Sequence, residues 1–96
     1  MIFIKRLIWD EWNVAHIARH DVVPDEVEEV CHGDPLVQQG HHERTVVVGA
    51  TASGRMLEVV LDPEPEPDVY YPITAHSASR KDRAFYQKEK GGEQAA

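Results

Sequence analysis

The stretch that decides the fold is residues 45–61, which read TVVVGATASGRMLEVVL. Its two halves are rich in β-branched and apolar residues, and each half has the length of a strand. The run Ala52-Ser53-Gly54-Arg55 between them has the composition of a turn. This stretch therefore predicts a β-hairpin with strands at 45–51 and 56–61.

Two short helices are predicted on the N-terminal side of the hairpin. Asn13 is a favourable N-cap for the first, which we expect to run to His20. The second begins near Pro24, because proline suits the first helical position. The residues expected to face the core from these two helices are Val14, Ile17, Ala18, Val27, Val30 and Cys31.

The remaining segments complete the predicted order of elements. Strands are expected at 1–8, 36–39 and 69–75, with Pro72 forcing a bulge or an edge position on the last of them. The acidic, proline-rich loop 62–68 should be extended and solvated, and a helix capped by Ser79 should end near Lys90. The order β-α-α-β-β-β-β-α predicts a single α+β domain over residues 1–90. We expect an antiparallel sheet of four to five strands, with two N-terminal helices and one C-terminal helix, and a flexible tail at 91–96.

Length and composition restrict the possible classes of protein. A chain of 96 residues supports one small domain with a modest core, which a partner would supplement. No apolar run approaches the roughly 20 residues of a membrane span, and the opening residues do not resemble a signal peptide. Cys31 is the single cysteine, so an intrachain disulfide and a cysteine zinc site are excluded. We therefore expect a cytoplasmic protein without a membrane segment.

The charge distribution points to the C-terminal segment. The net charge is −7, yet residues 74–96 hold five Lys or Arg against three Asp or Glu. Arg80, Lys81 and Arg83 crowd a helix start, where the helix dipole is already positive, and His76 precedes them. Such an arrangement can bind a phosphate and supply a proton-transfer group. The competing interpretation is an ordinary solvated helix whose arginines pair with acidic residues elsewhere, and it is somewhat favoured on charge alone.

Histidines and aromatic residues near the N-terminus allow further interpretations. His16 and His20 lie one helical turn apart and form half of a possible metal site, which His41 and His42 could complete. A metal-free surface is favoured. A second functional interpretation is that His16, Arg19 and His20 form a basic wall of a nucleic-acid groove. Trp9 and Trp12 could stack on bases, although they more often attach a helix start to the core. Phe85 is expected in the core, and Tyr86 could be buried or could contact RNA. Cys31 is expected to be structural.

Three segments together resemble the BrnT-type toxins. Residues 9–27, WDEWNVAHIARHDVVPDEV, and the later Asp34-Pro35 resemble the opening of that family. Residues 46–60, VVVGATASGRMLEVV, look like its central hairpin. Residues 73–86, ITAHSASRKDRAFY, resemble its usual closing motif. The likeness covers about residues 8–86.

The resemblance implies a RelE-like α+β fold and a metal-independent endoribonuclease that inhibits translation without a cofactor. It also implies a BrnA-like antitoxin with a ribbon-helix-helix domain. The toxin would bind DNA only through this antitoxin. The residues expected at the catalytic centre are His76, Arg80 and Arg83. Those expected to contact RNA are Arg19, His20, Arg55, Lys81 and Tyr86.

Three departures from the family pattern leave a second class of function open. His76 stands where the family usually has arginine, and Asp21 where it usually has glycine, a position that Asp tolerates less well. The acidic loop 62–68 has no counterpart in the family pattern. The net charge of −7 and the exchange at His76 favour the alternative, a non-catalytic module that holds a DNA-binding partner and regulates transcription. A histidine-based metal hydrolase is a third interpretation.

Overall fold

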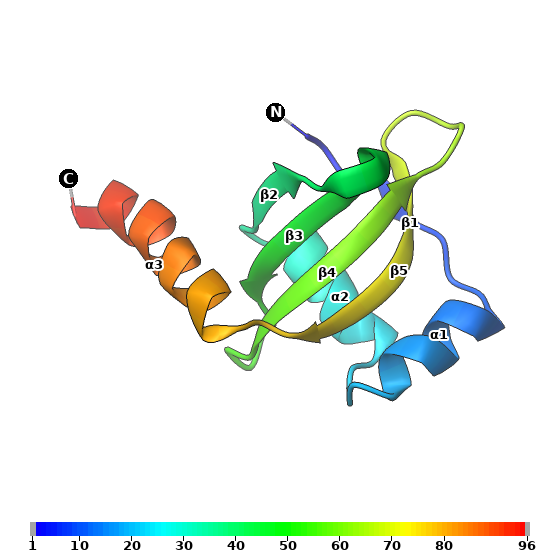
Figure 1. Cartoon of the computed structure of the whole chain (residues 1–96), viewed down its shortest axis with the longest axis horizontal. Helices are drawn as coiled ribbons and strands as arrows, with labels where there is room; N and C mark the ends of the chain where they lie inside the picture. Colours follow the sequence, from blue (N-terminus) through cyan, green and yellow to red (C-terminus); the bar gives the residue numbers. More distant parts are fainter. Residues whose placement is uncertain (1, 96) are drawn as a thin grey trace.

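The computed structural model describes residues 2–95 of the chain, and the side chains of residues 2–91. The elements in chain order are β1 (Arg6–Leu7), α1 (Glu11–Ala18), α2 (Pro24–Cys31), β2 (Leu36–Gln39), the short 3-10 helix η1 (His41–Glu43), β3 (Thr45–Ala50), β4 (Met56–Pro63), β5 (Val69–Ser77) and α3 (Arg80–Ala95). The strands form a five-stranded sheet in the order β1-β5-β4-β3-β2 (Figure 1). The predicted α+β class and the order of elements are confirmed. The sheet is mixed and not purely antiparallel, because β1 pairs parallel to β5.

The β3–β4 hairpin forms as predicted. Val47 pairs with Val59 in an antiparallel register, and the turn closes through a 2.9 Å bond from the Thr51 amide to the Arg55 carbonyl. Gly54 has a φ of 91° in this turn, a conformation that suits glycine. Gly49 allows a close approach of α2, because a Cβ there would lie 3.2 Å from the Val30 side chain. The hairpin is thus both the centre of the sheet and the surface on which α2 packs.

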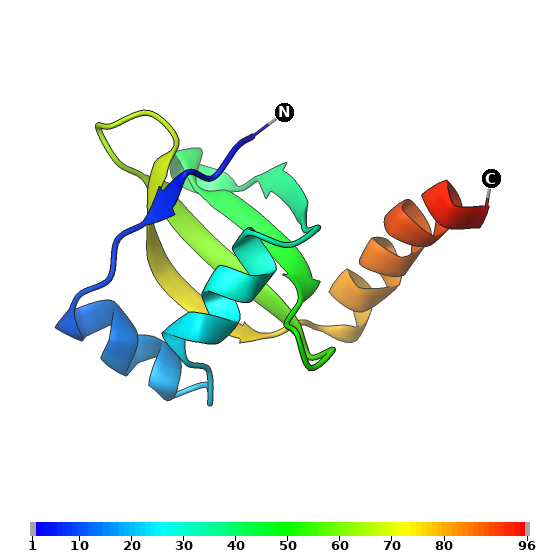
Figure 2. The ribbon, with the colours of Figure 1, turned by 180° about the vertical axis from the view of Figure 1, so that it is seen from behind.

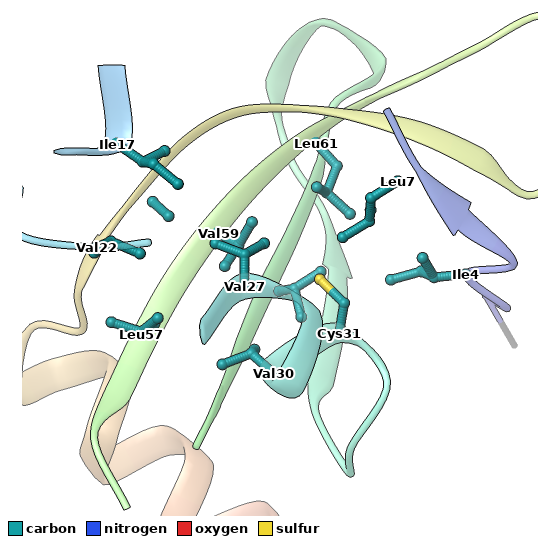
Figure 3. Packing of buried hydrophobic residues seen from close by; sticks show 12 residues of the cluster. Ile4, Leu7, Ile17, Val22, Val27, Val30, Cys31, Leu57, Val59 and Leu61 are labelled. Atoms are coloured by element: carbon teal, nitrogen blue, oxygen red, sulfur yellow. The ribbon is translucent and has the colours of Figure 1, made fainter. Parts of the chain in front are cut away.

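The core lies between one face of the sheet and the two N-terminal helices. Figure 2 shows α1 and α2 on that side of the sheet. Figure 3 shows side chains of α2 meeting alternate residues of β4, and the buried cluster includes Ile17, Val27, Leu57, Val59 and Leu61. Alternation along β4 sends Leu57, Val59 and Leu61 to this covered face and Glu58 to the open one. The expected core face of α2 is confirmed, since Val27, Val30 and Cys31 are all buried.

The start of α1 differs from the prediction. Asp10, and not Asn13, is the N-cap: its carboxylate accepts the Asn13 amide at 3.0 Å, and the Asn13 side chain accepts the Asp10 amide at 2.9 Å. Asn13 is fully buried, and its side-chain NH₂ also donates to the Ile8 carbonyl at 2.9 Å. With Asp10 as the N-cap, the helix starts three residues earlier than predicted, and Asn13 lies within it on the buried side. Ile17 is therefore buried as expected, whereas Val14 and Ala18 are exposed.

The two ends of the chain also differ from expectation. Strand β1 is only two residues long, although amides of Lys5 and Ile8 extend its bonding to residues 68 and 70. The expected bulge in β5 is present, as a register shift opposite Val60 and Leu61. Helix α3 continues past Lys90 into the expected tail, whose side chains beyond residue 91 lie outside the described part of the chain.

Helix α3 packs less closely than its apolar residues suggest. Phe85, expected in the core, is 43% exposed, because α3 projects beyond the β2 edge and does not lie flat on the sheet (Figure 1). Its anchor to the rest of the molecule is partly polar: the Tyr86 hydroxyl donates to the Asp34 carbonyl at 3.0 Å. Across residues 2–95, none of the helices combines the length and the apolar character that crossing a membrane requires.

Candidate functional site

His76 lies near the end of β5 on the open face of the sheet. Its backbone partner in β4 is Glu58, and its Nε2 lies 3.2 Å from a Glu58 carboxylate oxygen. Its Nδ1 lies 3.0 Å from the Ser77 carbonyl oxygen. Because both neighbours can accept, a protonated His76 ring can donate a hydrogen bond from each nitrogen. The strand register therefore holds the imidazole in one orientation.

Glu58 connects this histidine to the first turn of α3. A hydrogen bond with the Asp82 carboxyl, followed by partial burial, raises the pKa of Glu58 above its ordinary value, while His76 opposes the shift. The same hydrogen bond lowers the pKa of Asp82, which also accepts from Ser79. The two pKa values move in opposite directions, because Glu58 is the more buried of the two and Asp82 has the additional donors.

Asp82 also takes part in a capping box. The Ser79 hydroxyl accepts the Asp82 amide at 3.0 Å, and the Asp82 side chain accepts from the Ser79 backbone. The capping pattern predicted at the start of this helix is therefore present. It fixes α3 against the end of β5, with Asp82 facing the Glu58–His76 pair.

A second imidazole comes from the end of α1. The ring centroids of His20 and His76 are 5.9 Å apart, with an angle of 64° between their planes. Helix α1 runs beside β5, since the Tyr71 hydroxyl donates to the Asp10 carboxylate at 2.9 Å near the opposite end of both elements. This arrangement brings His20 to His76 although they are distant in the sequence.

Arg55 holds His20 in this place. Its guanidinium donates to the backbone carbonyls of Asp21 at 2.5 Å and His20 at 3.2 Å. It also donates to the Ser77 hydroxyl at 3.2 Å and lies 3.3 Å from the Glu26 carboxylate. Arg55 was expected to contact RNA. In the structure its donors are used in partly exposed hydrogen bonds within the protein, which join the loop after α1 to the end of β5.

The loop that carries His20 ends in a left-handed residue. Asp21 has a φ of 60°, the conformation that glycine adopts most easily. This matches the strain expected from Asp at that position, and it makes the chain turn sharply between α1 and α2.

Unlike Arg55, the cations at the start of α3 point their charged groups to solvent. Arg80, Lys81 and Arg83 are exposed, and within the described part of the chain none of their side chains forms a hydrogen bond or an ion pair. The same holds for Arg19 at the end of α1. Within residues 2–91, the alternative in which these arginines pair with acidic residues is therefore not what the structure contains. Tyr86, the remaining predicted contact, is half-buried and bonded to Asp34.

The histidines that could complete a metal site are not brought together. His41 and His42 lie in η1, at the other end of the sheet from the loop carrying His20 (Figure 1). Among the described residues there is no group of three or more His, Cys, Asp or Glu side chains that could hold a metal ion. Cys31 is buried, and burial followed by the nearby Glu28 raises its pKa to about 12.

The surface around His76 is open and is not an enclosed pocket. A hollow of about 550 Å³ lies between the N-terminal segment and the end of α2, and another of about 520 Å³ lies between α3 and β2. Neither is lined by His20 or His76, although the second borders Asp82 and Lys81. We place the candidate site at the histidine pair, since the proton-transfer groups are there. An extended polymer fits an open face better than a small molecule does.

Sequence reasoning did not identify Glu58. The available signal was a charged residue within the apolar strand 56–61, at a position that alternation assigns to the open face. The register that places it opposite His76 is a property of the β4–β5 pairing and is not visible in either segment alone.

The chain matches no protein-family model, no curated protein and no solved structure.

Proposed function

We propose that this protein is a metal-independent endoribonuclease, the toxin of a toxin–antitoxin pair of the BrnT type. The observation that carries the proposal is the pair of imidazoles, His20 and His76, whose ring centroids are 5.9 Å apart. Helix α3 begins soon after His76, and its Arg80 and Arg83 have no partner among the described residues. Two imidazoles this close together can act as base and acid on one phosphate bound against them. The resemblance of residues 9–27, 46–60 and 73–86 to the family supports the same activity.

In the proposed reaction, His20 accepts the proton of an RNA 2′-hydroxyl. The 2′-oxygen forms a bond to the adjacent phosphorus at the same time. The bond from phosphorus to the 5′-oxygen breaks, and His76 donates the proton that the leaving oxygen needs. The products are a 2′,3′-cyclic phosphate and a free 5′-hydroxyl. Glu58 orients the His76 ring and stabilises its protonated form, as a carboxylate does behind a catalytic histidine.

Arg80 and Arg83 would stabilise the charge that develops on the phosphoryl oxygens. Arg19 and Lys81 would contact neighbouring phosphates, since both are exposed and unpaired among the described residues. Arg55 takes a positioning role in this scheme, because its hydrogen bonds hold the backbone of His20 and the side chain of Ser77. We drop Tyr86 from the proposed RNA contacts, because its hydroxyl is bonded to Asp34.

The test is an RNA cleavage assay on the purified chain in the presence of EDTA, with His20→Ala and His76→Ala beside the parent. We expect each variant to lose about a hundredfold to ten-thousandfold of the cleavage rate, which is the usual contribution of a general acid or base. His41→Ala is the matched control, since this exposed histidine lies at the other end of the sheet. Cleavage that survives both histidine substitutions would contradict the site. Cleavage that EDTA abolishes would point to the metal hydrolase.

The second candidate is a non-catalytic module that binds a transcriptional regulator. It is favoured by the net charge of −7 and by the exposed Phe85 beside the hollow between α3 and β2. Expression of the chain without a partner separates the two: growth arrest requires the enzyme, whereas normal growth favours the module.

The proposal includes partners and a compartment. The toxin would act on RNA in the cytoplasm and would be neutralised by a BrnA-like antitoxin whose ribbon-helix-helix domain contacts DNA. Copurification of the chain with a coexpressed antitoxin, and loss of cleavage in that complex, would test this part.

A further inference from the structure

The two tryptophans near the start of α1 have different surroundings. Trp9 is half-buried against the core, and its Nε1 donates to Glu28 at 2.8 Å. Trp12 is 56% exposed, although it is among the largest apolar side chains of the protein. The predicted attachment to the core therefore holds for Trp9 and is wrong for Trp12.

Trp12 is exposed but held in a fixed orientation. Its ring is stacked on His16 one helical turn later, with centroids 4.8 Å apart and planes 7° from parallel. His16 in turn contacts His20 at 5.9 Å, and His20 contacts His76 at the same distance. A continuous row of aromatic rings thus runs along α1 from Trp12 to the phosphate site proposed at His20 and His76.

The surroundings of Trp12 suit a nucleobase better than the apolar surface of a protein partner. Its contact on the helix surface is the imidazole of His16, one turn later, and the residue before it is the exposed Glu11. A buried protein interface usually adds further apolar side chains around an exposed tryptophan. Stacking on a base needs only one flat, oriented ring with an accessible face.

We propose that the indole of Trp12 is a stacking platform for one unpaired nucleobase of an RNA strand whose phosphate is bound against His20 and His76. The inference rests on the proposed function and adds a substrate class, single-stranded RNA. A base within a duplex is already stacked on its neighbours and cannot reach the ring, so paired RNA would not use this platform.

The test measures binding of a short single-stranded 2′-O-methyl oligonucleotide, which cannot be cleaved because its 2′-hydroxyls are blocked. Fluorescence anisotropy of the labelled oligonucleotide gives the affinity for the parent, Trp12→Ala, Trp12→Phe and the control Val14→Ala. We expect Trp12→Ala to bind about tenfold more weakly, from the usual contribution of one stacked base. Trp12→Phe should retain most of the affinity, and Val14→Ala, which alters an exposed residue of the same helix, should match the parent.

A second measurement reports on Trp12 directly. Binding should quench the tryptophan emission of the parent, whereas Trp12→Ala, which retains only the half-buried Trp9, should show little quenching. Replacing the strand by its duplex should remove the difference between the parent and Trp12→Ala. Equal affinities of parent and Trp12→Ala for the single strand would overturn the inference.

The outcomes separate this inference from the proposed activity. If the parent cleaves RNA and Trp12→Ala binds the oligonucleotide equally well, the platform is wrong and the ribonuclease stands. If the parent binds through Trp12 but does not cleave, the platform stands and the catalytic proposal fails. If the parent neither binds nor cleaves, and Trp12→Ala instead loses a coexpressed antitoxin, the platform is wrong and Trp12 belongs to a protein interface.

Discussion

The two ends of the sheet use their charges differently. At the end where residues 62–68 join β4 to β5, Glu66 forms ion pairs with Lys5 and Arg6, and Asp62 pairs with Arg44. At the end where α3 begins, Arg80 and Arg83 have no partner among the described residues. The acidic loop, which has no counterpart in the family pattern, thus meets cations of the N-terminal segment through exposed ion pairs.

This comparison shows that exposed charge does not by itself identify a site. Arg55 and Arg83 are both arginines outside the core, yet the first is 29% exposed with its donors in use and the second is open to solvent. A binding role requires donors that are still available, and only the three-dimensional structure shows which ones are. The predictions below test that distinction, beginning with the largest effect.

Removing the unpaired arginines should have the largest effect. The double variant Arg80→Ala/Arg83→Ala should lower RNA cleavage about a thousandfold or more, because each removed donor to a developing oxyanion costs about a hundredfold or more. The temperature of unfolding should stay at the parent value, since neither side chain has a partner within the described residues.

Lys88→Ala removes another exposed cation of α3 and serves as the control for general electrostatics. Parent-like cleavage by the double variant would show that arginines without a partner do not mark the site of the reaction.

Removing the paired arginine should act mainly on stability. Arg55→Ala should lower the free energy of unfolding by about 2 kcal/mol, because hydrogen bonds from a charged donor to Asp21, His20 and Ser77 are lost together. Chemical denaturation measures this value. Arg55→Lys should recover less than half of it, since a single ammonium cannot reproduce the planar fork. A variant as stable as the parent would show that these contacts contribute nothing.

The carboxyl pair behind His76 predicts a pH effect. Because the pKa of Glu58 is raised, the folded state binds its proton more tightly than the unfolded chain does. The stability from this group is present below the ordinary value of 4.5 and is lost as the pH rises through the folded value. The lowered pKa of Asp82 acts in the opposite sense, giving stability that is lost as the pH falls.

The variant Asp82→Asn isolates the first effect. In an NMR titration, the pKa of Glu58 should fall towards 4.5, because the charge and the hydrogen bond that raise it are changed. Glu89→Gln, an exposed acid farther along α3, should leave the titration unchanged. An unchanged pKa of Glu58 in Asp82→Asn would show that burial alone causes the shift.

The left-handed residue in the loop after α1 offers a smaller, stabilising change. Asp21→Gly should raise the free energy of unfolding by about 0.5 kcal/mol, since glycine adopts a φ near 60° without the clash of a Cβ. The carbonyl that Arg55 contacts remains in place. Calorimetric unfolding measures the change, and a destabilised variant would mean that the Asp side chain contributes more than the strain costs.

The smallest effect is expected at the acidic loop. Glu66→Gln should shift the temperature of unfolding very little, because its ion pairs with Lys5 and Arg6 are exposed and screened by salt. RNA cleavage should be unchanged. A large loss of stability in Glu66→Gln, matched by a similar loss in the parent at high salt, would show that these ion pairs stabilise the fold more than we expect.

The fold was largely predictable because its signals are local. The hairpin 45–61 and the strand at 36–39 follow from apolar runs and turn residues, and Pro24 marked the start of α2. The frame of α1 was missed because Asp10 and Asn13 are both good cap residues, and reciprocal bonding between them selected Asp10. Phe85 was misplaced because helical periodicity marks an apolar position but does not show whether another element covers it.

The candidate site was only partly predictable. The sequence indicated His76, Arg80 and Arg83 as neighbours along the chain, and within the described residues the structure gives neither arginine a partner. It could not assign Glu58, whose contact with His76 depends on the register of two strands. It also could not show that Arg55 is hydrogen-bonded to other segments or that Trp12 is exposed, because both properties depend on how distant segments pack.

By itself, the sequence determined the order of the elements, the α+β class and the placement of basic residues at the start of the last helix. These properties depend on residue type and on spacing within one turn or one strand pair. The tertiary structure alone decided that β1 pairs parallel to β5 and that the His20 ring contacts the His76 ring. It also decided that the donors of Arg55 are hydrogen-bonded, whereas Arg80 has no partner among the described residues. Each of these depends on packing between segments far apart along the chain, and local periodicity carries no information about such distances.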